Sequence, residues 1–203
     1  MQNKNNLAYF ILILTTIFWS GNFIVGKAAS TYDIPPFSLN FYRWFFAGLI
    51  LFPFTIKELI SKKEYILENI GFFTILGITS ITIFNSIVYY SLYYTQVISG
   101  ILMISTIPVW IIFISSILNI EKTNIFQIIG VIFSLTGVIF IITKADLEII
   151  KNLDFNKGDL SMVVAMFSWA VYSALLKRKK YEISQVTLLP VSYTHLRAHE
   201  TGY

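Results

Sequence analysis

The sequence contains no cysteine, which excludes disulfide bonds and every metal, redox or nucleophilic site built on a thiol. Histidine is scarce as well, because the only two are His195 and His199, near the C-terminal end. Charged residues make up 13% of the 203 residues, about half the share of an ordinary soluble domain. The residue types on which most enzymes rely for acid–base, nucleophilic or metal chemistry are therefore rare.

Hydrophobic residues, in contrast, make up 56% of the chain, and the mean hydropathy is +0.69. A composition of this kind is typical of a membrane protein rather than a soluble one. The isoelectric point of about 9.2 raises the alternative of a nucleic-acid-binding protein. The basic residues lie between apolar blocks and form no continuous stripe, so we expect no nucleic-acid partner.

Long apolar segments follow one another along the chain. A helix that crosses a membrane needs about 20 mostly apolar residues. No charged residue occurs from Asn69 to Ile120, a run of 52 residues that suits two spans joined by a turn near Thr95. The sequence therefore predicts an all-α, polytopic membrane helix bundle with six transmembrane helices, at about residues 7–26, 37–56, 70–93, 98–118, 125–143 and 159–176.

The flanking charges predict how these spans are oriented. The first span could be a signal peptide, but its apolar run is long and no small-residue cleavage site follows, so a retained helix is expected. With the N-terminus inside, nine lysines and arginines flank the spans on the cytoplasmic side and four on the outer side. We expect a multi-pass protein of the cell membrane, a bacterial plasma membrane, with its N-terminus in the cytoplasm.

One spacing occurs twice. Trp19 precedes Lys27 by eight residues, and Trp169 precedes Lys177 by eight residues, each pair at the end of a predicted span. Five spans separate the starts of the two copies, so the second copy enters the membrane from the opposite side. Inverted repeats of this kind recur in secondary transporters, whose substrate sites lie between the repeats near the middle of the membrane.

Five longer motifs carry a family resemblance in the same order along the chain. They are FWSGNFIVGKAA, FYRWFFAGLIL, FNSIVYYSLYYTQVISGILMISTIPVW, IEKTNIFQIIGVIFSLTGVIFI and GDLSMVVAMFSWAVYSALLKR. Over residues 7–178 the chain resembles the EamA-type permeases of the drug/metabolite transporter superfamily. The resemblance implies a fold of ten spans in two inverted five-helix repeats, of which this chain offers six.

The resemblance also implies a division of the chain. Residues 1–143 are expected to form the first repeat of five transmembrane helices, followed by an extracytoplasmic loop over residues 144–158. Residues 159–190 begin a truncated second repeat. The remaining residues, 191–203, read VSYTHLRAHETGY and are polar, unlike everything before them. They resemble a translated adapter sequence, so we expect a non-native tail and take no function from its two histidines.

Polar and aromatic side chains that share one helical face are the informative positions, because lipid-facing positions need only be apolar. Such residues suit a cavity for an amphipathic organic solute, whereas helix packing and interface anchoring are the alternative role for each of them. The expected substrate-binding residues are Trp19, Asn22, Arg43, Asn85, Tyr89, Gln96, Ser99, Thr106, Trp110, Trp169 and Tyr172.

Arg43 is the one ionised residue well inside a predicted span. A charge there usually faces a cavity or a partner, although it could reach the outer interface from two turns into the helix. The resemblance favours a functional role, as an anion-attracting group or a cation–π partner. No aspartate or glutamate lies in the interior of the spans, so a buried carboxylate that couples transport to protons is not predicted, and neither is a metal site or cofactor.

Three functions remain to be compared. A secondary transporter that exports small organic metabolites or amphipathic solutes by alternating access fits best, with the lipid bilayer and a solute as its partners. The alternative is a six-helix membrane scaffold, or a fragment without transport activity. A membrane enzyme is not expected, because the spans lack cysteine, histidine and carboxylates. A homodimer is one assembly that the sequence leaves open.

Overall fold

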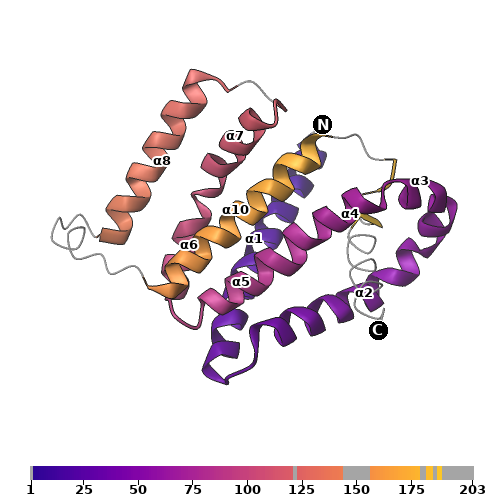
Figure 1. Ribbon diagram of the computed structural model, residues 1–203, viewed down its shortest axis with the longest axis horizontal. Coiled ribbons are helices and arrows are strands. Elements are labelled where there is room, and N and C mark those ends of the chain that lie inside the picture. The colour runs from indigo at the N-terminus through magenta and orange to yellow at the C-terminus, as the bar shows by residue number, and fades with distance from the viewer. Residues whose placement is uncertain (1, 121–122, 144–155, 179–181, 185–186, 189–203) are drawn as a thin grey trace.

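The structure is a computed structural model that describes residues 2–120, 123–143, 156–178, 182–184 and 187–188. These residues form helices joined by short turns, and no strand occurs among them (Figure 1). The predicted tail, residues 191–203, lies outside the described residues, as does most of the predicted loop. The helices are α1 (Gln2–Thr31), α2 (Pro36–Ser61), α3 (Lys63–Glu68), α4 (Ile70–Gly77), the π-helix η1 (Ile78–Ile83), α5 (Phe84–Ser91), α6 (Val97–Ile104), α7 (Ile107–Ile117), α8 (Ile125–Thr143) and α10 (Lys157–Arg178).

The prediction of an all-α polytopic membrane bundle is confirmed. Among the described residues, five helical stretches are long and apolar enough to cross a membrane. A sixth, α8, has 19 residues and corresponds to the fifth predicted span. The five stretches are 6–31, 36–61, 70–91, 97–117 and 157–178.

Two of the spans are not regular α-helices. The third span consists of α4, η1 and α5, so a π-helical segment lies in its middle. The fourth span is broken between α6 and α7 at residues 105–106, and Pro108 lies in the first turn of α7. Proline has no backbone N–H, so it is tolerated in a first turn, where that donor has no helical partner.

Helix ends follow from short polar residues at defined positions. Asp33 after α1 and Asn119 after α7 adopt positive φ angles of 52° and 51°. In each case the next residue donates back into the helix, from Ile34 to the Ala29 carbonyl at 3.0 Å and from Ile120 to the Ser115 carbonyl at 2.9 Å. This is the Schellman arrangement, in which a left-handed residue lets the last carbonyls find donors.

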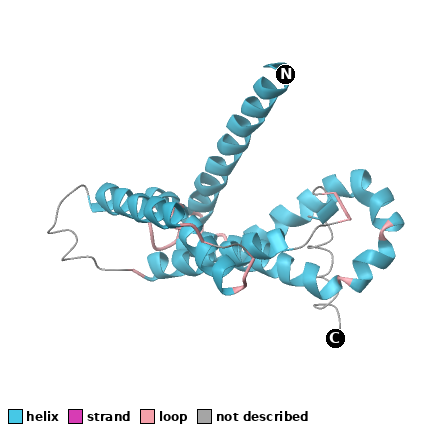
Figure 2. Ribbon diagram, turned by 90° about the horizontal axis from the view of Figure 1, so that it is seen from above, coloured by secondary structure: helices cyan, strands magenta, loops and turns pink. Residues whose placement is uncertain are grey.

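Helix α10 is the centre of the bundle. It packs mainly against α5 and α7 and also touches η1, α6 and α4 (Figure 1). Its inner face is fully buried and alternates methionine with small residues, which lets neighbouring helices approach closely. The N-terminal half of α1, by contrast, extends away from the other helices (Figure 2). The buried residues of this α10 face are Met162, Ala165, Met166, Ala170 and Ala174.

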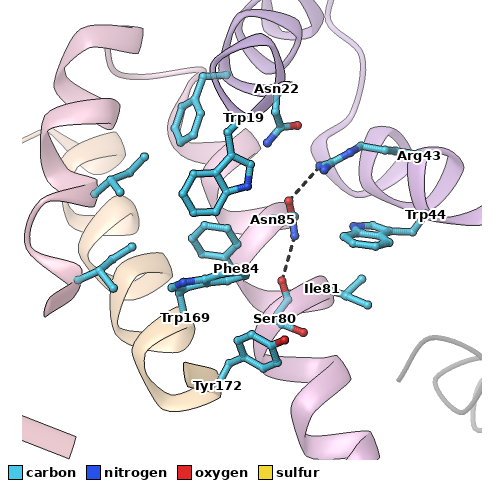
Figure 3. Close-up of a pocket in the computed structure, with 13 residues that line it drawn as sticks. Trp19, Asn22, Arg43, Trp44, Ser80, Ile81, Phe84, Asn85, Trp169 and Tyr172 are labelled. Atoms are coloured by element: carbon cyan, nitrogen blue, oxygen red, sulfur yellow. Dashed lines mark hydrogen bonds between the residues drawn. The ribbon is translucent and has the colours of Figure 1, made fainter. Parts of the chain in front are cut away.

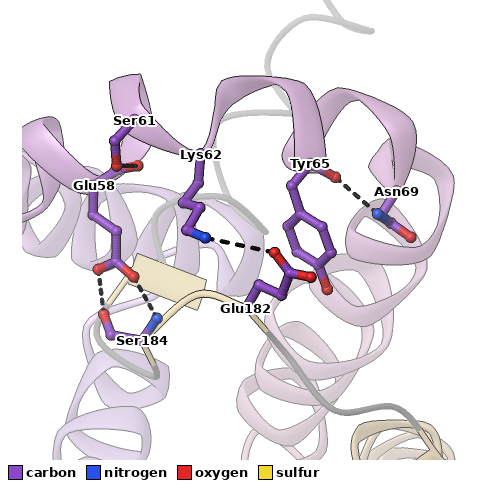
Figure 4. Close-up of polar contacts among 7 residues, drawn as sticks. All are labelled: Glu58, Ser61, Lys62, Tyr65, Asn69, Glu182 and Ser184. Carbon is purple, nitrogen blue, oxygen red and sulfur yellow. Dashed lines mark hydrogen bonds and ion pairs between the residues drawn. The ribbon is translucent and has the colours of Figure 1, made fainter.

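The end of α2 is tied to the chain that follows α10 (Figure 4). The Glu58 carboxylate accepts hydrogen bonds from the backbone N–H and the hydroxyl of Ser184, both at 2.6 Å, and from the Thr187 hydroxyl at 2.6 Å. Lys62 and Glu182 form an exposed ion pair at 3.5 Å, which contributes little by itself. Residues 182–184 and 187–188 therefore close one end of the bundle against the first repeat.

The opposite end of α10 is fixed by its own cap. Asp159 N–H donates to Asn156 Oδ1 at 3.0 Å, and the Asp159 carboxylate accepts the Asn156 N–H at 3.2 Å, which is a capping box. This cap starts α10 at Lys157, two residues before the predicted span. Ser91, the last residue of α5, donates to the Gly158 carbonyl at 2.5 Å, and Thr95, in the turn after α5, donates to the Asp159 carboxylate at 2.8 Å.

Replacing Gly158 with alanine is expected to destabilise the protein by about 1–3 kcal/mol, the usual cost of overpacking. A Cβ atom at this position would lie 2.7 Å from the Ser91 carbonyl oxygen and 2.9 Å from the Thr95 nitrogen, and neither backbone atom can move freely. The measurement is the free energy of unfolding in detergent micelles titrated with SDS. The matched control is Gly71→Ala, because a Cβ there meets nothing within 4 Å. Equal stability of the two variants would contradict the expected backbone clash.

Candidate functional site

A cavity of about 110 Å³ lies where the helices that precede α8 face α10. Its walls come from every span that the structure describes except the one formed by α8. One part of the lining is aromatic and another part is polar (Figure 3). The lining residues are Trp19, Asn22, Phe23, Arg43, Trp44, Ser80, Ile81, Phe84, Asn85, Ile104, Ile107, Trp169 and Tyr172.

The two tryptophans of the repeated Trp–Lys spacing meet in this cavity. The rings of Trp19 on α1 and Trp169 on α10 are 6.0 Å apart in an edge-to-face arrangement. Trp169 also contacts Phe84 at 4.6 Å and Tyr172 at 5.1 Å between ring centroids. Edge-to-face and tilted aromatic pairs are favourable, so these four rings form one continuous apolar wall. The cavity wall thus joins α1 to α10.

The opposite side of the cavity carries a chain of hydrogen bonds across three helices. The Tyr89 hydroxyl donates to Asn22 Oδ1 at 2.6 Å. Arg43 Nη1 donates to the Tyr89 oxygen and, at 3.0 Å, to Asn85 Oδ1. The Asn85 amide in turn donates to the Ser80 carbonyl at 2.9 Å (Figure 3). Because each member orients the next, Arg43 is held at the cavity rather than extended to an interface.

The guanidinium of Arg43 has N–H donors that these hydrogen bonds do not use. Both of its hydrogen bonds use Nη1, and within the described residues Nη2 and Nε donate none. The same group lies over the Trp44 ring, 5.3 Å from the ring centroid, in a cation–π contact. Arg43 and Trp19 are both exposed, so the cavity opens between α1 and α2. An anionic group that enters here meets a fixed cation with unused N–H donors.

The π-helical segment η1 forms part of the wall and is held from three directions. The Thr79 carbonyl accepts from the Ser168 hydroxyl of α10 at 2.8 Å. The Ile81 carbonyl accepts a hydrogen bond from the buried Asn40 amide of α2 at 2.9 Å. The Ser80 carbonyl accepts one from the Asn85 side-chain amide at 2.9 Å. Short π-helical segments occur mostly at functional positions, and this one places Ser80, Ile81 and Asn85 in the cavity.

Ser168→Ala is expected to destabilise the bundle by about 0.6–1.7 kcal/mol, the range measured for hydrogen bonds between membrane helices. The substitution leaves the Thr79 carbonyl without its donor from α10. Ser173→Ala is the matched control, because its hydroxyl donates to the Trp169 carbonyl of the same helix, at 2.8 Å. Both variants are compared by SDS-induced unfolding. A larger loss in the control would show that the bond to η1 contributes nothing to stability.

The expected site residues divide into those that meet at this cavity and those that lie elsewhere. Six of the eleven line it, namely Trp19, Asn22, Arg43, Asn85, Trp169 and Tyr172, and Tyr89 links two of these, Asn22 and Arg43, by hydrogen bonds. The remaining four do not line this cavity. Gln96 is exposed in the turn before α6, Ser99 is half-buried on α6, Thr106 donates to the Met103 carbonyl, and Trp110 packs on Phe113 and Phe167.

Lys27 has a structural role that its place at the end of a span did not reveal. Its Nζ donates to the carbonyl oxygens of Leu92 at 2.7 Å and Thr95 at 3.0 Å. An ammonium group at the C-terminal end of a helix satisfies carbonyls that lack helical donors. Lys27 therefore fixes the end of α5 to α1.

Several cavity residues were not expected from the sequence. Trp44, Phe23 and Phe84 are aromatic residues in strongly apolar segments, where they do not stand out from lipid-facing positions. Ser80 lies five residues before Asn85, which fits a π-helical turn but not the α-helical spacing used to select faces. Within the described residues, no group of three or more histidine, cysteine or acidic side chains is placed to hold a metal ion.

Apolar membrane-length helices around a partly aromatic, partly polar cavity define a polytopic membrane protein with an internal cavity. Residues 6–143 match the model of the EamA-like transporter family, which is about two thirds of the chain. The chain belongs to this family. The match places it among membrane transporters and not among enzymes.

Curated relatives agree with this family. The chain is 28% identical over 170 residues to the uncharacterized transporter YyaM of Bacillus subtilis, covering 84% of this chain and 55% of that protein. It is 26% identical over 189 residues to an uncharacterized transporter of Archaeoglobus fulgidus, covering 93% of this chain and 64% of that protein. The chain thus spans less than two thirds of the length of these relatives. No solved structure matches it significantly.

Proposed function

We propose that this chain is part of a secondary transporter for small amphipathic organic solutes that carry a carboxylate or a similar anionic group. The observation that carries the proposal is the division of the cavity lining into an aromatic wall and a guanidinium with unused donors. The aromatic wall suits the apolar part of a solute, and Arg43 suits its anionic part. Trp19, Asn22, Arg43, Asn85, Tyr89, Trp169 and Tyr172 are the proposed substrate-binding residues.

The proposal includes export by alternating access from a bacterial cytoplasm, with the N-terminus inside as the basic flanking residues favour. Two sets of contacts between α10 and the first repeat support it. One joins Asp159 and Gly158 to the turn after α5, and the other joins Glu58 to Ser184. The two sets lie at opposite ends of α10. In alternating access, one set opens while the other stays closed.

Solute binding is tested by tryptophan fluorescence, because three of the four tryptophans line the cavity. The probes are 3-phenylpropionate and its neutral amide, titrated into the full chain in detergent. We expect a saturable change for both, with the acid bound about tenfold or more tightly, as a charge-assisted hydrogen bond predicts. Trp110→Phe is the matched control and is expected to keep the response, because Trp110 does not line the cavity.

Two results would speak against the proposal. Equal affinity for the acid and the amide would remove Arg43 as the anion-binding group. The absence of any saturable response would favour the alternative, a membrane scaffold or a fragment without solute binding.

A further inference from the structure

A second cavity, of about 170 Å³, lies between α7, α8 and α10, away from the aromatic cavity. It lies where α7 ends, α8 begins and α10 ends. These are ends of spans, so the cavity lies at one end of the bundle, at a membrane surface. None of its lining residues belongs to the solute cavity described above. The lining residues are Pro108, Ile111, Ile112, Ser115, Thr123, Gln127 and Lys177.

The polar side chains of this cavity are donors, and one of them is charged. Ser115 is 3% exposed, and its hydroxyl has no hydrogen-bond partner among the described residues although it lines the cavity. A buried hydroxyl without a hydrogen-bond partner destabilises the fold, and a ligand that accepts a hydrogen bond from it would remove this cost. Lys177 adds the positive charge, and Thr123 adds a second hydroxyl. The lining residues that the structure describes include no carboxylate, and as a set they fit a ligand made of acceptor oxygens with negative charge.

The N-terminus of α8 supplies further donors. Asn124 caps this helix, since it accepts from the Phe126 N–H at 3.1 Å and its own N–H donates to Gln127 Oε1 at 2.9 Å. The amide nitrogen of Gln127 makes no hydrogen bond within the described residues, so it is left to donate into the cavity. A helix N-terminus also favours an anion through its partial positive charge. Two carbonyls in the last turn of α7, those of Ser115 and Ser116, are already engaged, because Ile120 and Asn119 donate to them.

The apolar part of the cavity lining favours a lipid over an inorganic anion as the ligand. Pro108, Ile111 and Ile112 share one face of α7 with Ser115, and they lie deeper in the span than the polar residues. The cavity is therefore apolar towards the membrane interior and polar at its end. The neighbouring helix α8 also exposes large apolar side chains such as Phe126 and Phe133, as a helix in contact with acyl chains does. Basic cavities of this kind between transmembrane helices bind the head groups of anionic lipids.

We propose that the cavity between α7, α8 and α10 binds the phosphate of an anionic phospholipid, with Lys177, Ser115 and Gln127 as donors and α7 against the acyl chain. With an N-terminus in the cytoplasm, the lipid belongs to the inner leaflet. This site is separate from the solute cavity and does not depend on the function proposed for it.

The test is native mass spectrometry of the full chain in detergent, titrated with phosphatidylglycerol or with a diacylglycerol of the same acyl chains. We expect phosphatidylglycerol to bind about tenfold more tightly, because only it carries the phosphate. Lys177→Gln is expected to lower its affinity about fivefold or more. Arg178→Gln is the matched control, which removes the same charge one residue further along α10 but outside the cavity, and it is expected to change the affinity less than about twofold.

A second variant keeps the test decisive if Lys177→Gln does not fold. Ser115→Ala removes a hydroxyl that has no partner, so it is expected to leave the melting temperature unchanged or raised while it weakens phosphatidylglycerol binding about threefold. Equal binding of the two lipids, or equal effects of the Lys177 and Arg178 substitutions, would overturn the proposal. Binding of millimolar inorganic phosphate that displaces the lipid would overturn the lipid assignment in favour of a free anion.

Discussion

Arg43→Gln is expected to weaken binding of 3-phenylpropionate by about thirtyfold to a few thousandfold, while binding of the neutral amide changes little. The reason is that the substitution removes the cation of the cavity and also the donor to Tyr89 and Asn85. Truncating one partner of a desolvated, hydrogen-bonded charge pair costs about 2–5 kcal/mol, which corresponds to this range. The measurement is the tryptophan fluorescence titration, with acid and amide compared in each variant.

Arg43→Lys separates charge from geometry. Lysine keeps the positive charge but lacks the planar arrangement of donors that lets Arg43 hold Tyr89 and Asn85 while it binds a solute. We expect an affinity for the acid between those of the wild type and Arg43→Gln. Full affinity in the lysine variant would show that charge alone is recognised. A parallel loss of acid and amide binding in Arg43→Gln would show instead that Arg43 only maintains the fold.

Gly26→Ala is expected to destabilise the bundle by about 1–3 kcal/mol and to weaken solute binding as well. A Cβ atom on Gly26 would lie 2.8 Å from Tyr89 Cδ1 and 2.9 Å from Leu92 Cδ1. Both neighbours are fully buried, and Tyr89 is held by hydrogen bonds to Asn22 and Arg43. The Tyr89 ring can move away from the added methyl group only by breaking these hydrogen bonds. The substitution therefore disturbs both the helix packing and the polar side of the cavity.

Gly100→Ala is the matched control for this effect. Its added Cβ would lie 2.9 Å from Met162 Cε, the far end of a flexible side chain, and its other neighbours are 3.7 Å away. Methionine adapts to irregular space, so we expect a cost below about 1 kcal/mol and no change in solute affinity. The two variants are compared by SDS-induced unfolding and by the fluorescence titration. Equal costs at the two glycines would contradict the role assigned to Tyr89.

Much of the fold could be predicted from the sequence because membrane spans are defined by composition over long windows. The absence of charge from residue 69 to residue 120 was enough to place two spans. The repeated tryptophan spacing drew attention to Trp19 and Trp169, and their rings lie in contact. Helix ends were harder, since Asp33 and Asn119 end their helices through left-handed conformations that glycine more often adopts.

The candidate site was predicted less completely than the fold, for two physical reasons. Face selection by α-helical spacing assumes an unbroken helix, but the third span contains a π-helical turn and the fourth is broken before Pro108. On that assumption Gln96 was expected on one face with Asn85, and Trp110 on one face with Thr106, and neither Gln96 nor Trp110 lines the cavity. The aromatic residues Phe84 and Trp44 were not selected, because an apolar ring gives no signal in a sequence where apolar rings are common.

The π-helical turn has a consequence for how this chain is aligned with its relatives. Each residue of an α-helix turns the chain by about 100°, so one residue more or less in the segment 78–83 changes which side chains after it face inward. Phe84, Asn85 and Tyr89 all follow that segment. A relative with a regular helix there corresponds to this chain only with a one-residue gap inside the third span. An ungapped alignment would pair Asn85 with a residue that faces the lipid, and the binding residues of the two proteins would be compared at the wrong positions.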